Sequence, residues 1–260
     1  MELGLGGKVA VVTGASKGIG LAITRRFVEE GARVIAGSRT TSAELAELAE
    51  AGSVESVTVD LAEPDGPARL VAAAGDRLDI LVNNVGFGAP RLDGFLAITD
   101  DMWQQTLNLD FMASVRAIRA ALPPMLANGG GAIVNVGSVN ARLPLPMVTD
   151  YSAAKAAFSN LAKSLSKEFG PKNIRVNTVE PGPVVTDFWL GRDGLASVLG
   201  ATDGKSAEQV TEEFASGSTV SGRFTRPEEV ADLVLMLASD RFANIMGAGV
   251  AIDGGMIPTL

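Results

Sequence analysis

The chain has 260 residues, of which 47% are hydrophobic and 20% charged, and its formal net charge is -8. It contains no cysteine and no histidine, which excludes disulfides, a thiolate nucleophile, a zinc site and a Ser-His-Asp triad, so we expect no metal. Nucleic acid is an unsuitable partner for an acidic chain without a long basic run. We find neither a signal-like start nor an apolar run of about 18 to 20 residues, and therefore expect no membrane contact and a cytoplasmic location.

Short apolar runs alternate with longer helical patterns from one end of the chain to the other. Runs that are apolar without clean alternation are typical of strands buried on both faces of a sheet. The candidate strands are residues 8–13, 33–38, 56–60, 79–83, 132–137, 174–179 and 249–253. This pattern predicts an α/β fold, a doubly wound parallel sheet of about seven strands with helices on both faces.

No linker, repeat or low-complexity tract divides the chain, so residues 1–260 are predicted to form one domain. The stretch at about 188–222 differs from the rest because it is rich in Gly, Ser and Thr, with scattered large apolar residues. We interpret it as an insertion outside the sheet. Long segments of this kind often close over a substrate, and a substrate lid is the expectation here.

A glycine-rich turn, TGASKGIG at residues 13–20, follows the first candidate strand and precedes a helical pattern. Gly14, Gly18 and Gly20 allow a tight strand-to-helix turn and let a pyrophosphate approach the helix N-terminus. The plainer alternative is a tight connection of the sort found in any α/β protein. Because the turn follows the first strand directly, we favour a dinucleotide-binding, Rossmann-type domain.

The residues after the second candidate strand indicate which dinucleotide is bound. An acidic residue there favours NAD, but this chain has Gly37, Ser38 and Arg39. The Arg39 guanidinium can donate bidentate hydrogen bonds to a ribose 2′-phosphate, and Lys17 in the glycine-rich turn adds a second cation. The alternative is that both are solvated surface cations, which two cations at the places that a 2′-phosphate must pass make less favoured. We expect NADP(H) in preference to NAD(H).

The segment TDYSAAKAAFSN, residues 149–160, contains the chain's one tyrosine. Tyr151 and Lys155 are four residues apart and share a face of a helix. An exposed tyrosine and lysine on an alanine-rich helix would have the same spacing without any chemical role.

Several motifs in this order resemble the short-chain dehydrogenase/reductases, in the group called classical, over nearly the whole chain. They are TGASKGIG at 13–20, Asp60-Leu61, NNVG at 83–86, Asn108, Ser138, Tyr151-x-x-x-Lys155, PGPVVT at 181–186 and DGG at 253–255. Two residues depart from the family pattern: Val85 replaces an alanine, and Glu180 replaces a small residue. The family commonly forms homotetramers, so the resemblance implies a homotetramer or a homodimer.

The resemblance and the preceding arguments together assign three sets of residues. The catalytic set is Asn108, Ser138, Tyr151 and Lys155. The cofactor-binding set is Gly14, Ser16, Lys17, Gly18, Ile19, Gly20, Ser38, Arg39, Asp60, Leu61, Asn84, Gly86, Tyr151, Lys155, Pro181, Gly182, Val184 and Thr186. The substrate-binding set is Ser138, Asn140, Leu145, Tyr151, Phe188 and Trp189. Individually, Asn108, Ser138 and Thr186 also suit ordinary helix, turn and cap positions.

The expected reaction is hydride transfer between NADP(H) and a ketone or secondary alcohol, with Tyr151 as general acid and base. A lysine cation about 5 Å away, at an effective dielectric constant of about 20, would lower the pKa of the phenol by about two units. Ser138 would bind the carbonyl oxygen. The resemblance further implies that Lys155 holds the nicotinamide ribose and that Asn108 supports a proton relay.

The residues around the expected site are mainly apolar, which favours an apolar small-molecule carbonyl or alcohol as partner. A 3-oxoacyl carrier-protein reductase is the main alternative. Such enzymes offer basic residues to an acidic carrier, whereas here MLANGGGA at 125–132 has none and the other candidate region offers only Lys167, Lys172 and Arg175. A further alternative is a non-catalytic NADP(H)-sensing protein, although such relatives typically lack the tyrosine or the lysine.

Overall fold

The computed structural model describes residues 2–192 and 194–259. Its centre is one seven-stranded sheet of order β3-β2-β1-β4-β5-β6-β7, in which every neighbouring pair is parallel. The strands are β1 (Val9–Thr13), β2 (Arg33–Ser38), β3 (Val54–Thr58), β4 (Ile80–Asn83), β5 (Gly131–Val136), β6 (Ile174–Pro181) and β7 (Gly249–Ile252). The predicted fold class is confirmed, and β3 begins two residues before the candidate run at 56–60.

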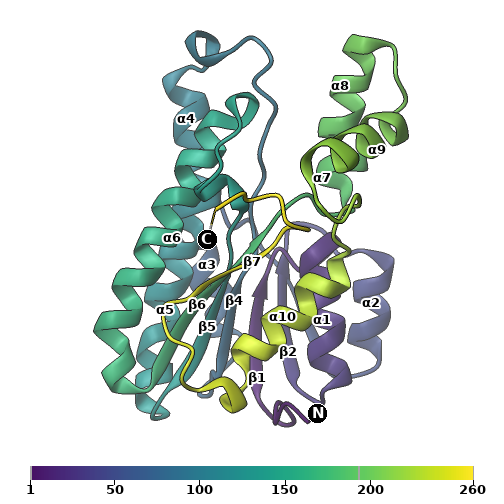
Figure 1. Cartoon of the computed structure of the whole chain (residues 1–260). Coiled ribbons are helices and arrows are strands. Elements are labelled where there is room, and N and C mark those ends of the chain that lie inside the picture. Colours follow the sequence, from purple (N-terminus) through teal and green to yellow (C-terminus); the bar gives the residue numbers. More distant parts are fainter. Residues whose placement is uncertain (1, 193, 260) are drawn as a thin grey trace.

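Helices cover both faces of this sheet (Figure 1). On one face lie α1 (Gly18–Glu29), α2 (Ala43–Glu50) and α10 (Pro227–Ala238). On the other lie α3 (Gly66–Ala72), α5 (Ala113–Ala127) and α6 (Thr149–Phe169), with α4 (Asp100–Leu107) packed against α6. Within the described ranges, no helix is both long and apolar enough to cross a bilayer.

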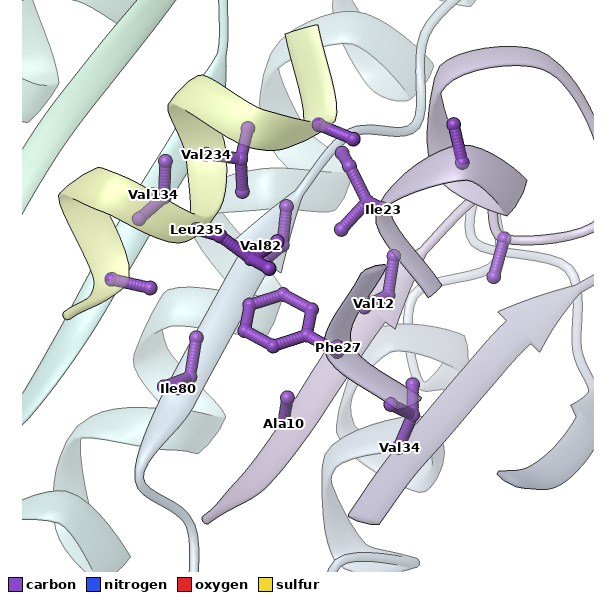
Figure 2. Packing of buried hydrophobic residues seen from close by; sticks show 14 of the residues in the cluster. Ala10, Val12, Ile23, Phe27, Val34, Ile80, Val82, Val134, Val234 and Leu235 are labelled. Atoms are coloured by element: carbon purple, nitrogen blue, oxygen red, sulfur yellow. The ribbon is translucent and has the colours of Figure 1, made fainter. Parts of the chain in front are cut away.

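The apolar strands pack against these helices in two buried clusters, one on each face of the sheet. In the first, Phe27 of α1 is fully buried, and its ring is surrounded by apolar side chains that include Ala10, Val82 and Leu235 (Figure 2). Removing a buried aromatic ring of this kind costs about 3 to 5 kcal/mol of stability. Because both faces are covered, strands such as VAVVT in β1 are apolar throughout and do not alternate.

The topology reverses direction beside β1, because β2 and β3 extend the sheet on one side and β4 to β7 extend it on the other. Loops leaving the carboxyl ends of β1 and β4 therefore diverge to opposite faces. Such a switch point is where open parallel sheets bind ligands.

The segment after β6 lies outside the sheet and is mainly helical (Figure 1). It contains α7 (Asp187–Leu190), α8 (Leu195–Asp203) and α9 (Ala207–Ser218). These helices have a small apolar cluster of their own, in which the Trp189 ring lies 4.7 Å from Phe214 and 4.9 Å from Phe224. We call residues 187–218 the helical insertion.

Candidate active site

A cavity of about 720 Å³ lies at the carboxyl ends of the strands, and most of the residues predicted for the site line it. These are Gly14, Ser16, Lys17, Gly18, Ile19, Ser38, Arg39, Asp60, Leu61, Asn84, Gly86, Ser138, Asn140, Leu145, Tyr151, Lys155, Pro181, Gly182, Val184, Thr186, Phe188 and Trp189. Two predicted residues, Gly20 and Asn108, are not part of its lining.

The glycine-rich turn is tied to the end of β4 by hydrogen bonds. The Thr13 hydroxyl accepts from the backbone N–H groups of Asn84 (2.8 Å) and Val85 (3.0 Å). In return, the Asn84 amide donates to the carbonyl oxygens of Thr13 (3.0 Å) and Gly14 (3.1 Å). Gly14 adopts a φ of 66°, a conformation that favours glycine. The turn is therefore held rigidly against the cavity.

This turn fits a nucleotide pyrophosphate. Helix α1 begins at Gly18, no acidic residue lies in its first turn, and both Gly18 and Lys17 line the cavity. An anion at a helix N-terminus is stabilised by free backbone N–H groups and by the helix dipole. The donor set is thus the one that a dinucleotide phosphate requires.

Gly20 lies behind the turn and contributes packing. A Cβ atom at this position would lie 2.1 Å from the Gly14 carbonyl oxygen and 2.6 Å from the Asn84 amide nitrogen. Only glycine lets α1 approach β1 and β4 this closely. Gly20 thus shapes the turn, and its contact with the cofactor stays a prediction.

The residues expected near a 2′-phosphate lie together at the end of β2. Ser38 is buried and donates to the Thr40 carbonyl oxygen (2.9 Å), while Arg39 is exposed and forms no ion pair within the described ranges. Lys17 pairs instead with Asp187 at the start of α7 (3.1 Å), with both side chains about 70% exposed. Lys17 is therefore shared between the nucleotide turn and the helical insertion.

Three of the predicted catalytic residues meet at one place. Tyr151 and Lys155 lie one turn apart on α6, and the Lys155 Nζ is 5.4 Å from the centre of the Tyr151 ring. Lys155 is only 2% exposed, and its ammonium donates to the Val136 carbonyl oxygen at the end of β5 (3.2 Å). Ser138, two residues further along the chain from Val136, lies close enough to the Tyr151 phenol to lower its pKa.

The electrostatics of Tyr151 differ from the expectation. Burial raises the pKa of Tyr151 above its ordinary value, the charge of Asp110 raises it further, and only the hydrogen bond with Ser138 lowers it. Burial also lowers the pKa of Lys155, and Asp110 opposes that change. Burial and the nearby carboxylate of Asp110 thus act on the pKa of Tyr151 in the direction opposite to the one predicted for Lys155, whose effect on the phenol stays a prediction.

The structure places Asn108 outside the lining of the cavity. Its amide donates to the Ala62 carbonyl oxygen (2.8 Å) and its oxygen accepts from Arg116 (2.7 Å), so the side chain ties the turn after β3 to α5. Asn108 begins a π-helical turn, Asn108–Met112, inserted between α4 and α5. Residues two apart on a helix point in nearly opposite directions, so Asn108 and Asp110 face different sides.

Asp110 is the functional candidate that the sequence reasoning missed. Its side chain is fully buried, and burial raises its pKa to about 7. The backbone N–H of Phe87 donates to its Oδ1 (2.9 Å). A visible signal was available, since an acidic residue between Leu109 and Phe111 interrupts an otherwise apolar helical stretch.

The other end of the cavity is aromatic and apolar. The Phe188 ring stacks on the Tyr151 ring, with centres 6.1 Å apart, and Phe87 meets Phe188 edge-on at 6.3 Å. Trp189 reaches the lining but is mostly buried within the insertion's own cluster. The lining also includes apolar residues outside the predicted substrate-binding set: Phe87, Val139, Val148, Leu195, Phe214 and Met256.

The two residues that depart from the family pattern lie beside this site. Glu180 is 2% exposed, and Arg142 forms an ion pair with it (2.7 Å), which joins β6 to the segment after Ser138. Burial raises the pKa of Glu180 and Arg142 lowers it. Val85 lines the cavity and packs against the core cluster below it.

A parallel sheet with a glycine-rich first turn, together with a tyrosine-lysine pair at the carboxyl ends of its strands, defines an α/β oxidoreductase that binds a nicotinamide nucleotide. A family model described as "Enoyl-(Acyl carrier protein) reductase" matches residues 14–257. The chain belongs to the short-chain dehydrogenase/reductase family.

Three relatives illustrate this membership. The uncharacterized oxidoreductase YvrD of Bacillus subtilis is 34% identical, with both chains fully covered. The 3-oxoacyl-[acyl-carrier-protein] reductase FabG of Thermotoga maritima is 33% identical over 97% of this chain and 99% of its own. An L-sorbose reductase from Gluconobacter frateurii, solved with NADPH and L-sorbose, has a TM-score of 0.91 and 36% identity, with both chains fully covered.

Proposed function

We propose that this protein is an NADP(H)-dependent oxidoreductase that interconverts a ketone and a secondary alcohol on an apolar small molecule. The observation that carries the proposal is the meeting of Ser138, Tyr151 and Lys155 in the cavity that begins at the glycine-rich turn. These are the groups that a carbonyl reduction needs in order to bind the oxygen and give it a proton.

The preference for NADP(H) rests on the end of β2. Arg39 is exposed on the cavity rim and has no carboxylate partner within the described chain, so its guanidinium is available to a phosphate. Ser38 and Thr40 complete this rim without adding an acid that would repel a 2′-phosphate. The NADPH and NADP complexes among similar structures support the same choice.

The bound nucleotide supplies or accepts the hydride, and the chain manages the accompanying proton. Tyr151, whose raised pKa keeps it protonated at neutral pH, donates its proton to the developing alkoxide. Ser138 hydrogen-bonds the same oxygen as negative charge develops. Lys155 remains one turn behind, where its ammonium stabilises the phenolate that is left.

The substrate preference rests on the aromatic end of the cavity. Phe188 covers the ring of Tyr151, and Phe87 lies against Phe188. A substrate carbonyl that reaches Tyr151 therefore brings its substituents against apolar surfaces. The helical insertion contributes Phe188, Trp189 and Phe214 to this wall, and we assign it the role of a substrate lid over a single nucleotide-binding domain.

A polyhydroxylated ketose is a second candidate, because a structure with a TM-score of 0.91 is that of an L-sorbose reductase. Each buried sugar hydroxyl needs a hydrogen-bond partner, and an apolar wall leaves it unpaired at a cost of about 1 to 3 kcal/mol. Apart from Ser138 and Tyr151, Asn140 is the polar side chain of the predicted substrate set. The lining thus favours the apolar substrate.

A carrier-protein substrate is less favoured by the surface. Of the three basic residues considered for an acidic carrier, Arg175 is only 5% exposed and donates to the carbonyl oxygens of Leu237 and Ala238. Its charge is committed to the C-terminal end of α10. Lys167 and Lys172 alone make a weak binding patch for a polyanionic partner.

The decisive test follows the absorbance of NADPH and of NADH with aryl, aliphatic and cyclic ketones, with L-sorbose, and with an acetoacetyl thioester. We expect turnover with NADPH and apolar ketones. Tyr151→Phe is the matched control, because it removes only the hydroxyl and keeps the ring beside Phe188. Faster turnover of L-sorbose or of the thioester would replace the proposed substrate class, and nucleotide binding without any turnover would indicate a sensor.

The assembly proposed with this function is a homotetramer or a homodimer. Light scattering on the purified protein measures its mass directly, and a mass equal to one chain of 26.8 kDa would contradict the proposal.

A further inference from the structure

The rim of the cavity contains one ion pair that the proposed mechanism does not use. Lys17 of the glycine-rich turn and Asp187 at the start of α7 both line the cavity, and the Lys17 Nζ lies 3.1 Å from the Asp187 Oδ2. Among the described residues, neither side chain has another ion pair or hydrogen bond. The pair therefore connects the nucleotide turn to the helical insertion, between residues 170 positions apart.

Packing also holds the start of α7 against the nucleotide turn. A Cβ atom built on Gly18 would lie 3.2 Å from the Thr186 Cγ2, so the residue before Asp187 lies directly against the N-terminus of α1. The Thr186 carbonyl oxygen accepts from the backbone N–H groups of Trp189 (3.0 Å) and Leu190 (2.9 Å), which fixes the first turn of α7. The backbone thus presents the Asp187 carboxylate to the turn.

The charges around the cavity single out this pair. The charged residues in the described lining are Lys17, Arg39, Asp60, Lys155 and Asp187. Lys155 is only 2% exposed, and the Asp60 carboxylate accepts from the backbone N–H of Ala62 (2.9 Å). Of the two cations assigned to a 2′-phosphate, Arg39 is therefore available within the described chain, whereas Lys17 already has a carboxylate partner.

A 2′-phosphate and the Asp187 carboxylate are alternative anions for the same ammonium. A phosphate monoester carries a charge of about −1.5 to −2 near neutral pH, so it is the stronger partner for Lys17. Its gain is nevertheless reduced by the strength of the pair that it disrupts. For an exposed ion pair, that strength corresponds to a factor of about 1.4 to 5 in a binding constant. A nucleotide with a 2′-hydroxyl group does not compete for Lys17 and incurs no such loss.

We propose that Asp187 competes with the 2′-phosphate of NADP(H) for Lys17 and so limits the preference for NADP(H) over NAD(H). The inference rests on the proposed binding of NADP(H), and it assigns the discrimination in the wild type mainly to Arg39. Removal of the Asp187 charge frees Lys17 and strengthens the discrimination. The helical insertion therefore takes part in the choice of nucleotide as well as in covering the substrate.

Fluorescence titration of the purified protein with NADPH and with NADH, at low ionic strength and without a substrate, tests this role. The quantity to compare is the Kd for NADH divided by the Kd for NADPH. We expect Asp187→Asn to raise this ratio about two- to fivefold. Asp187→Glu keeps the charge and should retain the wild-type ratio. Asp203→Asn, which removes an exposed acid of the helical insertion outside the cavity lining, is the matched control.

Lys17→Met, made in the wild type and in Asp187→Asn, completes a double-mutant cycle. Because Asp187 engages the wild-type ammonium, Lys17→Met should lower the ratio less in the wild type than in the Asp187→Asn background. Both side chains are exposed, so neither substitution leaves a buried charge without a partner. The differences should shrink as salt is added, because exposed charges are screened.

A ratio in Asp187→Asn equal to or below that of the wild type would overturn the proposal, as would equal effects of Lys17→Met in the two backgrounds. Arg39→Ala separates this outcome from the cofactor assignment. A lower ratio in Arg39→Ala, with no change in Asp187→Asn, would remove only the role of Asp187 and leave the preference for NADP(H) in place. A ratio near one in every protein would overturn both.

Discussion

Replacing Asp110 with asparagine should change how the stability of the protein depends on pH. The substitution removes one buried ionisable group and keeps both the size of the side chain and the oxygen that accepts from Phe87. Burial raises the pKa of Asp110 from 3.8 to about 7 in the folded chain. Each unit of difference in the Asp110 pKa between the folded and unfolded chains corresponds to about 1.4 kcal/mol. The ionisation of Asp110 therefore changes the free energy of unfolding by about 4 kcal/mol.

The sign follows from which state holds the proton. Between about pH 4 and pH 7 the folded wild type keeps a proton on Asp110 that the unfolded chain has released, so raising the pH favours unfolding. The folded wild type has its full stability with respect to this group below pH 4, where Asp110 is protonated in both states. It loses about 4 kcal/mol of that stability as the pH rises through about 7. Asp110→Asn has no such group, and we expect it to gain about 4 kcal/mol relative to the wild type over this interval.

Urea unfolding at a series of pH values, followed by circular dichroism, measures this difference. All other titrating groups are shared, so subtracting the two curves isolates Asp110 and its coupling to Lys155. Ser114→Ala, which alters a buried uncharged side chain one turn further along, should run parallel to the wild type throughout. A difference between wild type and Asp110→Asn that stays constant from pH 4 to pH 8 would refute the reasoning.

Three further substitutions test other parts of the structure. Arg39→Ala should lower kcat/KM for NADPH about tenfold or more and leave that for NADH unchanged in steady-state assays, and an equal fall for both would contradict phosphate binding. Gly20→Ala should lower the melting temperature by several degrees because its Cβ meets a carbonyl at 2.1 Å, whereas Gly217→Ala, with nothing within 4 Å, should not. Arg91→Met should lower the free energy of unfolding in urea by about 3 to 5 kcal/mol, because it leaves the buried Asp150 carboxylate without its cation. Arg33→Met, which removes the cation of an exposed ion pair, should lower it by at most about 1 kcal/mol.

The sheet and most of the cavity followed from the sequence because their signals are local. A parallel strand buried on both faces is a continuous apolar run, and a nucleotide-binding turn needs its glycines at fixed places after the first strand. Tyr151 and Lys155 are equally local, since four residues on a helix bring them together. Because these groups follow the carboxyl ends of parallel strands, they lie together at one end of the sheet.

The sequence at about 188–222 predicted an insertion but did not predict the helices of the helical insertion. Its Gly, Ser and Thr content indicated a loop, while the structure stabilises it by packing Trp189 against Phe214 and Phe224. That packing joins residues up to 35 positions apart, and short helices depend on such tertiary contacts more than on propensity. One local signal was present: Ser206 and Gln209 form a capping box at the start of α9.

The exchange of roles between Asn108 and Asp110 could not be predicted from periodicity. A π-helical turn adds a residue to the local repeat, and every side chain within it is rotated relative to a regular helix. A motif match identifies a residue by its type and by its place among the other motifs of the sequence. Asn108 met both of these criteria. Only the contacts show that Asn108 bonds Ala62 and Arg116 while Asp110 faces Lys155.

This exchange changes the electrostatic argument for the reaction itself. A lysine cation alone beside Tyr151 would favour the phenolate, but the structure adds burial and a nearby carboxylate, both of which favour the neutral phenol. A neutral phenol is the form that donates a proton to a reduced carbonyl, whereas alcohol oxidation must first remove that proton. Among the chain's own groups, burial and the Asp110 charge thus favour the form of Tyr151 that acts as an acid. Removal of the Asp110 charge should therefore move the alkaline limb of the pH profile of ketone reduction to lower pH, and superimposed profiles of Asp110→Asn and the wild type would contradict this argument.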